Sequence, residues 1–138
     1  MKLSEFRNLF DIHEKNGELF EFVSYMSQVL LEHEEGNIPL PVEFGNSQFH
    51  ALSNLTEDVI SYEDWVDLFE TIQNSIQEEW DITTYNNLIK IYCSSHGFKY
   101  VSQKYDFIDF INEHISEMER QGFKLKLRTF LPIFNIFF

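Results

Sequence analysis

Apolar side chains recur every three or four residues along most of this chain, which is the spacing of one face of an α-helix. Five stretches show the pattern: residues 3–13, 19–33, 65–80, 85–92 and 107–118. Ser61, followed by Asp64, forms a capping-box-like start before the third stretch, and glycines follow the other stretches as end signals. We therefore expect a mainly α fold, with residues 1–138 forming a single compact domain of about five helices.

One segment between the second and third stretches lacks helical character. Pro39 and Pro41 are followed by Gly45-Asn46, and this combination disfavours a helix. Residues 37–47 are therefore predicted to form an extended loop that carries its apolar side chains inward.

A different periodicity follows Gly122. From Phe123 to Arg128 apolar and basic residues alternate strictly, with Lys124 and Lys126 on the basic side, which predicts a short half-buried C-terminal strand. Residues 130–138 are too apolar to remain in water, so we expect them to dock on the core or on another chain, with the core favoured.

Composition indicates a globular protein. The chain is 43% hydrophobic and contains 15 Phe, six Tyr and two Trp, whereas acidic disordered segments are poor in aromatic residues. Cys93 is the only cysteine, which excludes an internal disulfide and suits a reducing compartment. No apolar run reaches the roughly 20 residues of a membrane span, and the start does not resemble a signal peptide, so a cytoplasmic location away from membranes is expected.

Charge is distributed unevenly along the chain. Of 23 acidic residues, 18 precede position 82, where only Lys2, Arg7 and Lys15 oppose them. The chain thus divides into an acidic part (1–81) and a near-neutral part (82–138), with a formal net charge of −13. Such a field attracts a basic protein partner and repels nucleic acid.

The acidic residues concentrate around the third helical stretch. Glu63, Asp67 and Glu70 follow one another at helical spacing, which places their carboxylates along one exposed face, and positions 57–81 contain no base. A solvated helix face is the plain alternative. The predicted partner-binding residues are Glu57, Asp58, Tyr62, Glu63, Asp64, Asp67, Glu70, Glu78, Glu79 and Asp81, with Tyr62 as an aromatic anchor.

Catalytic and metal-binding patterns are weak by comparison. The histidines and carboxylates lack metal-ligand spacing, and no Gly-rich phosphate loop is present. Cys93 and His96 lie three residues apart, yet a buried, inert cysteine is the better interpretation of this pair. We expect no enzymatic activity, no metal and no cofactor.

The C-terminal part carries a family resemblance. The stretch from Thr83 to Cys93 with Gly97 after it resembles the first helix of a pentatricopeptide repeat, and Met118 to Gly122 resembles the end of its second. The stretch from Leu127 to Ile133 resembles the opening of a next copy. The resemblance implies stacked helical hairpins that bind RNA.

Three hypotheses follow. The leading one is an acidic protein-binding module, similar in physical character to immunity and antitoxin proteins, that neutralises a nuclease toxin by charge mimicry. The alternative is an RNA-binding helical-repeat protein or fragment, in which Phe123–Arg128 must be a turn between helices rather than a strand. A structural subunit would instead pack Phe134, Phe137 and Phe138 on a neighbouring chain. The oligomeric state is left open.

Overall fold

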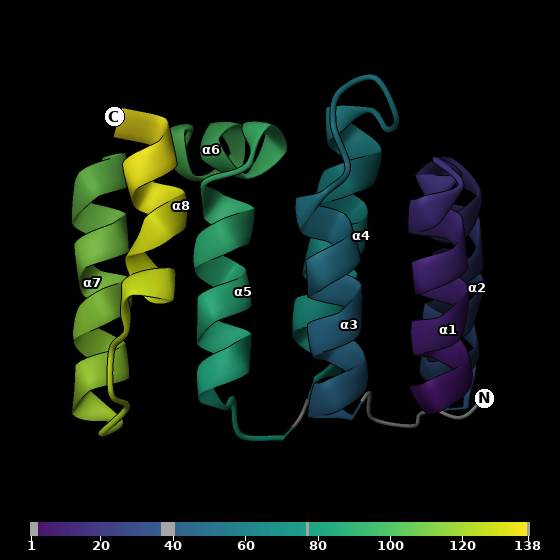
Figure 1. The fold of residues 1–138 in the computed structure, drawn as a ribbon, viewed down its shortest axis with the longest axis horizontal. Helices are drawn as coiled ribbons and strands as arrows, with labels where there is room; N and C mark the ends of the chain where they lie inside the picture. The colour runs from purple at the N-terminus through teal and green to yellow at the C-terminus, as the bar shows by residue number, and fades with distance from the viewer. Residues whose placement is uncertain (1–2, 37–40, 77, 138) are drawn as a thin grey trace.

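The computed structural model describes residues 3–36, 41–76 and 78–137, which form eight α-helices and no strand. The helices are α1 (Leu3–Lys15), α2 (Leu19–Glu35), α3 (Val42–Ser53), α4 (Tyr62–Ser75), α5 (Ile82–Tyr92), α6 (Ser95–Ser102), α7 (Phe107–Arg120) and α8 (Leu127–Phe137) (Figure 1). The predicted mainly α class is confirmed, whereas the expected number of about five helices is too low. No helix within the described ranges has both the length and the apolar character that crossing a bilayer requires.

The helices form hairpins that stack along the long axis of the molecule (Figure 1). Within hairpins, α1 packs on α2 and α3 on α4; between hairpins, α1 contacts α3, α3 contacts α5, and α2 contacts α4. Each unit therefore touches chiefly its neighbours in the stack, as in helical-repeat architectures. At the C-terminal end the short α6 runs across the end of α5, and α8 packs back on α5.

An aromatic cluster fixes α4 within this stack. Trp65 and Phe69 of α4 stack with ring centroids 5.3 Å apart, and Phe69 meets Tyr100 of α6 edge-on at 5.3 Å. Trp65 is fully buried, and its Nε1 donates a hydrogen bond to the Leu52 carbonyl at 3.3 Å. Because these rings hold the inner face of α4, its acidic outer face has a fixed orientation.

Several helix ends lie where the sequence places them. Ser61 caps α4, since its Oγ accepts a hydrogen bond from the Asp64 amide at 3.2 Å. Gly17 after α1 and Gly122 after α7 have φ values of +71° and +81°, which only glycine adopts without strain.

The extended loop predicted over residues 37–47 is wrong from Val42 onward, where α3 begins; residues 37–40 lie outside the described ranges. Pro41 occupies the N-cap of α3 with φ −58°, at a helix end where its missing N–H costs little. Phe44 points inward as predicted and is buried together with Phe49. Their burial outweighs the cost of about 1 kcal/mol for Gly45 inside a helix.

Two further helix boundaries differ from the prediction. The third helical stretch ends at Ser75, so Trp80 lies in the connection to α5, where its ring meets Tyr85 at 5.5 Å. His96-Gly97, predicted to end a helix, lies inside α6. A Cβ at Gly97 would overlap the Ile91 carbonyl, so a close approach of α6 to α5 requires glycine here.

The strand predicted over Phe123–Arg128 is also wrong. Residues 123–126 form an irregular connection between α7 and α8, and Leu127 already belongs to α8. Phe123 and Leu125 pack around Met118, while the lysines beside them stay exposed. The alternation therefore reflects a half-buried extended connection that has no partner strand among the described residues.

The apolar C-terminal segment docks on the core, as predicted, in the form of α8. Ile133 and Ile136 pack against the core, whereas Leu131 and Phe137 remain 46% and 45% exposed. Phe138 lies outside the described ranges. One face of α8 is thus core and the other is surface.

Candidate protein interface

The outer face of α4 and the turn before it bring together the first group of predicted residues. Asp58, Glu63, Asp64, Asp67 and Glu70 are all exposed, and we call these five residues the α4 ridge. They face outward because the apolar stripe of α4 is held in the aromatic core. The spacing read from the sequence therefore places this group on one surface.

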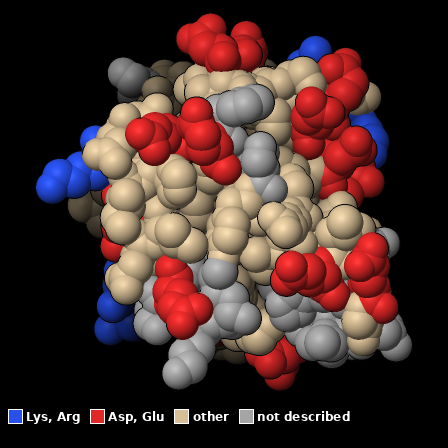
Figure 2. All heavy atoms as spheres, turned by 90° about the vertical axis from the view of Figure 1, so that its right-hand side faces the viewer, with Lys and Arg blue, Asp and Glu red and all other residues tan. Residues whose placement is uncertain are grey.

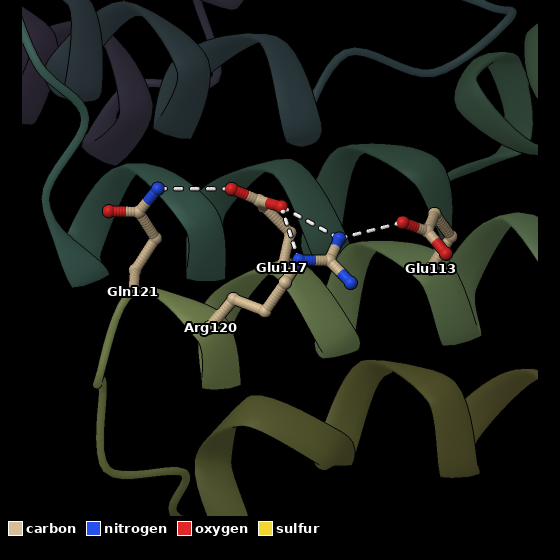
Figure 3. A network of polar contacts seen from close by, with 4 residues as sticks. All are labelled: Glu113, Glu117, Arg120 and Gln121. Carbon is tan, nitrogen blue, oxygen red and sulfur yellow. Dashed lines mark hydrogen bonds and ion pairs between the residues drawn. The ribbon is translucent and has the colours of Figure 1, made fainter.

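The ridge carboxylates make no ion pair with a Lys or Arg among the described residues. Within the described part of the chain, the Lys or Arg ion pairs are those of Arg120 on α7, whose guanidinium contacts Glu113 and Glu117, each at 2.7 Å. Glu117 also accepts a hydrogen bond from Gln121 (Figure 3). Glu113 and Glu117 of α7 are thus paired within their own helix, whereas the ridge acids have no such pair among the described residues.

Acidic side chains are not confined to α4. Figure 2 shows the end of the stack formed by α1 and α2, where acidic groups lie on several sides of the face and basic groups lie towards its edges. Exposed acids of these helices include Asp11, Glu14, Glu21, Glu32 and Glu35. The acidic surface is therefore wider than the predicted site, and any test of the α4 ridge needs a control on α2.

Tyr62, the predicted anchor, is half-buried at the start of α4. Its Oη donates a hydrogen bond to Gln103 Oε1 at 3.1 Å, and Lys99 Nζ lies 4.3 Å from its ring centroid. Lys104 Nζ lies 4.9 Å from the ring of Tyr100. The fold thus brings two lysines close to the ridge, although residues 57–81 contain no base.

Two predicted residues at the ridge margin have partners from α6. Glu57 Oε1 accepts a hydrogen bond from Ser95 Oγ at 2.7 Å. Glu70 makes a side-chain hydrogen bond with Tyr100 of α6. Burial raises the pKa of Tyr100, and the negative charge of Glu70 and this hydrogen bond raise it further. Asp58, Glu63, Asp64 and Asp67 are the ridge members without such a partner among the described residues.

The structure places Glu78, Glu79 and Asp81 apart from this group, in the connection between α4 and α5. Five further residues of α4, about 8 Å of helix at 1.5 Å per residue, separate Glu70 from Ser75, and this second group follows the end of the helix. Glu78 Oε2 accepts a hydrogen bond from the Val42 amide at 3.1 Å, at the start of α3. This second group therefore lies at the junction of three helices, while Glu79 is exposed.

Asp81 is the N-cap of α5. Its Oδ1 accepts hydrogen bonds from the amide and hydroxyl of Thr84, both at 2.9 Å, and from Asn46 Nδ2 at 3.3 Å. Burial would raise the pKa of Asp81, but the hydrogen bonds from Thr84, Asn46 and Thr83 hold it below its usual value. The ionised carboxylate therefore stabilises the folded state.

Replacing Asp81 by alanine should lower the free energy of unfolding by about 1–2 kcal/mol at neutral pH, because α5 loses its cap. The loss should shrink as the pH falls from 3.8, the ordinary pKa of the aspartate, through the lower pKa of the folded state, since protonation removes the charge that the hydrogen bonds stabilise. Urea unfolding of both proteins at pH 7 and pH 3 measures this. An unchanged stability at pH 7 would contradict the capping role.

Cys93 and His96 do not form an activated pair. Burial raises the pKa of the Cys93 thiol to about 12, the opposite of what a thiolate nucleophile requires. His96 is buried, and its Nε2 lies 3.0 Å from the Ile60 carbonyl. Nor do the described residues contain a group of three or more His, Cys, Asp or Glu that could hold a metal ion.

A hollow that sequence reasoning did not predict lies between α3, α5 and α8. Its volume is about 660 Å³, and we call it the α5 groove because α5 contacts both of the other helices. Asn86 and Lys90 line it from α5, Cys93 from the C-cap of that helix, and Arg128 and Leu131 from α8. Three segments far apart in the sequence build it, so no local motif could indicate it.

No family model, curated protein or solved structure matches this chain.

Proposed function

We propose that this chain is an acidic binding protein that docks the α4 ridge on a basic partner protein. The concrete form is an immunity or antitoxin protein that blocks a nuclease toxin. One observation carries the proposal: the exposed carboxylates of α4 share a single helix face and have no Lys or Arg ion pair among the described residues.

Charge mimicry supplies the mechanism. A nuclease holds its substrate through phosphate groups, and a row of carboxylates presents a comparable array of negative charge to the same cleft. Electrostatic attraction accelerates the encounter, while contacts at the centre of the interface slow dissociation. No metal or cofactor takes part. Cys93 as the single thiol suits a reducing compartment, so we place this interaction in the cytoplasm.

The contacts of each residue divide the predicted set by role. Asp58, Glu63, Asp64 and Asp67 form the docking surface, and Tyr62 borders it as a ring held in place by Gln103. Glu57 and Glu70 form the margin next to α6. Glu78 and Asp81 stabilise the helix junction, and their carboxylates are already engaged there.

A second candidate function is RNA binding by a helical repeat. The stacked hairpins favour it, and so does the connection at residues 123–126, which joins two helices as a repeat would require. Lys124, Lys126 and Arg128 are exposed and would contact the RNA backbone. The overall charge of −13 opposes this function, which is why it stands second.

Capture from a lysate of the source cell tests the leading proposal. The bait proteins are the wild type, a ridge variant with Glu63, Asp64 and Asp67 changed to the corresponding amides, and an α2 control with Glu21, Glu32 and Glu35 changed to glutamine. Both variants lose three negative charges, so they differ only in where the charge is removed.

The expected result is a basic protein that the wild type and the α2 control retain and the ridge variant loses. Retention by all three baits would refute the α4 ridge as the docking surface. Recovery of RNA in place of a protein, with loss on changing Lys124 and Lys126 to glutamine, would support the second candidate function instead.

A further inference from the structure

We propose that the α5 groove is a second binding site, which takes an extended peptide segment carrying an acidic side chain next to an aliphatic one. The groove lies on the layer of α3, α5 and α8, whereas the α4 ridge belongs to a helix that lies behind α3 in Figure 1. The two sites can therefore serve different partners.

Positive charge is the first reason. Lys90 and Arg128 both line the groove, both are exposed, and neither makes an ion pair with a described residue. They face a common hollow from α5 and α8, in a chain whose net charge is −13. A carboxylate is the group that two such cations recognise best.

The side-chain amides that line the groove are the second reason. Asn86 Oδ1 is buried and accepts no hydrogen bond from the described residues, although a buried carbonyl oxygen is normally paired. Asn54, Asn87 and Asn135 also line the groove. Side-chain amides both donate and accept hydrogen bonds, as the peptide backbone does, so the accessible amides of Asn54, Asn87 and Asn135 can pair with a bound main chain.

The wall formed by α8 is the third reason. Leu131, Pro132 and Ile136 line this side, and Leu131 is 46% exposed. An aliphatic side chain of the ligand would cover this wall. At about 660 Å³, the hollow lies in the size range of pockets that enclose small ligands, so it has room for a few residues of a peptide.

The lining also distinguishes a peptide from single-stranded nucleic acid. Such nucleic acid stacks its bases on aromatic rings, and none of the residues that line the α5 groove is aromatic. A neighbouring hollow of about 370 Å³, which shares Thr83 and Asn87 with the groove, is lined by Asp11 and Glu14. These carboxylates would repel a phosphate backbone that continued beyond the cations.

The test uses a fluorescent, acetylated and amidated peptide, Gly-Ser-Glu-Leu-Asp-Leu-Ser-Gly, with a control in which Gln and Asn replace Glu and Asp. Anisotropy measures binding to the whole chain. The second readout is the rate at which an alkylating reagent modifies Cys93, the only cysteine, which lines the groove and is half-buried. A bound peptide must cover this thiol.

We expect the acidic peptide to bind the wild-type chain and to slow the alkylation of Cys93 at least fivefold. Its binding to the Lys90→Glu and Arg128→Glu variants should be at least tenfold weaker. The matched control is Lys104→Glu, which makes the same charge change at an exposed position outside the groove. Lys104→Glu should bind as the wild type does, and the amide peptide should bind at least tenfold more weakly.

Three outcomes would overturn the inference. The first is no binding of the acidic peptide at millimolar concentration. The second is binding that leaves the alkylation of Cys93 unchanged or survives both charge reversals. The third is that an eight-nucleotide oligouridine binds and protects Cys93 while the peptide does not, which would assign the groove to RNA.

Discussion

Replacing Glu63, Asp64 and Asp67 together by lysine is expected to slow association with the captured basic partner by about 100-fold at low salt. Electrostatic steering raises association rates by about 10 to 1,000-fold over an uncharged encounter, and this variant reverses the sign of the field at the docking surface. Stopped-flow mixing measures the rate directly. Dissociation should change less, because these carboxylates lie on an exposed helix face.

Salt provides an independent check on the same claim. The wild-type association rate should fall steeply between about 0.01 and 0.15 M salt, because the Debye length shortens from about 30 Å to about 8 Å. The lysine variant should show no such fall.

The control for this prediction is a triple reversal on α2, at Glu21, Glu32 and Glu35, which are equally exposed. It changes the net charge by the same six units but leaves the α4 ridge intact. Equal slowing of both variants would mean that the partner responds to the overall charge of the molecule and that the ridge is not a specific surface.

Local sequence signals predicted those parts of the fold that local interactions decide. Ser61 caps α4, and Gly17 and Gly122 follow their helices in the left-handed conformation. The amphipathic stripe of α4 also predicted which face carries the acids. These features depend on residues within a few positions of one another, so a single sequence contains them.

Features that depend on tertiary contacts were not predicted. The helix α3 contains Gly45 and begins after Pro41, and it forms because Phe44 and Phe49 are buried by packing with distant residues. The exposed lysines beside Phe123 and Leu125 follow an alternating pattern, but a strand also needs a partner strand. Burial pattern and strand pairing are separate conditions, and the sequence shows only the first.

The candidate sites show the same division. Helical spacing locates the α4 ridge, but Lys99 reaches Tyr62 only because α6 folds across α5. In the sequence, Asp81 is one more acid of a charged region. In the structure, it accepts hydrogen bonds from Thr84 and Asn46 and is the N-cap of α5. The α5 groove needs three helices to meet. A charged residue in the sequence can therefore be assigned to a binding surface only when its hydrogen-bond and ion-pair partners in the fold are known.

The largest expected effect on stability is that of Gly97→Ala in α6. Helix propensity alone predicts that alanine would stabilise the helix by about 1 kcal/mol. The added Cβ would instead overlap the Ile91 carbonyl of α5, which is backbone and cannot rotate away. We therefore expect Gly97→Ala to lower the free energy of unfolding by about 3 kcal/mol, the upper part of the range for overpacking.

Gly122→Ala is the matched control, because nothing lies within 4 Å of a Cβ at Gly122, while its φ of +81° disfavours alanine. That variant should lose only about 1 kcal/mol, from backbone strain without a clash. Urea unfolding of both variants separates the two causes, and a stabilised Gly97→Ala would show that α6 does not press on α5. Because Lys99 and Gln103 hold Tyr62 from this region, Gly97→Ala should also disturb the margin of the α4 ridge.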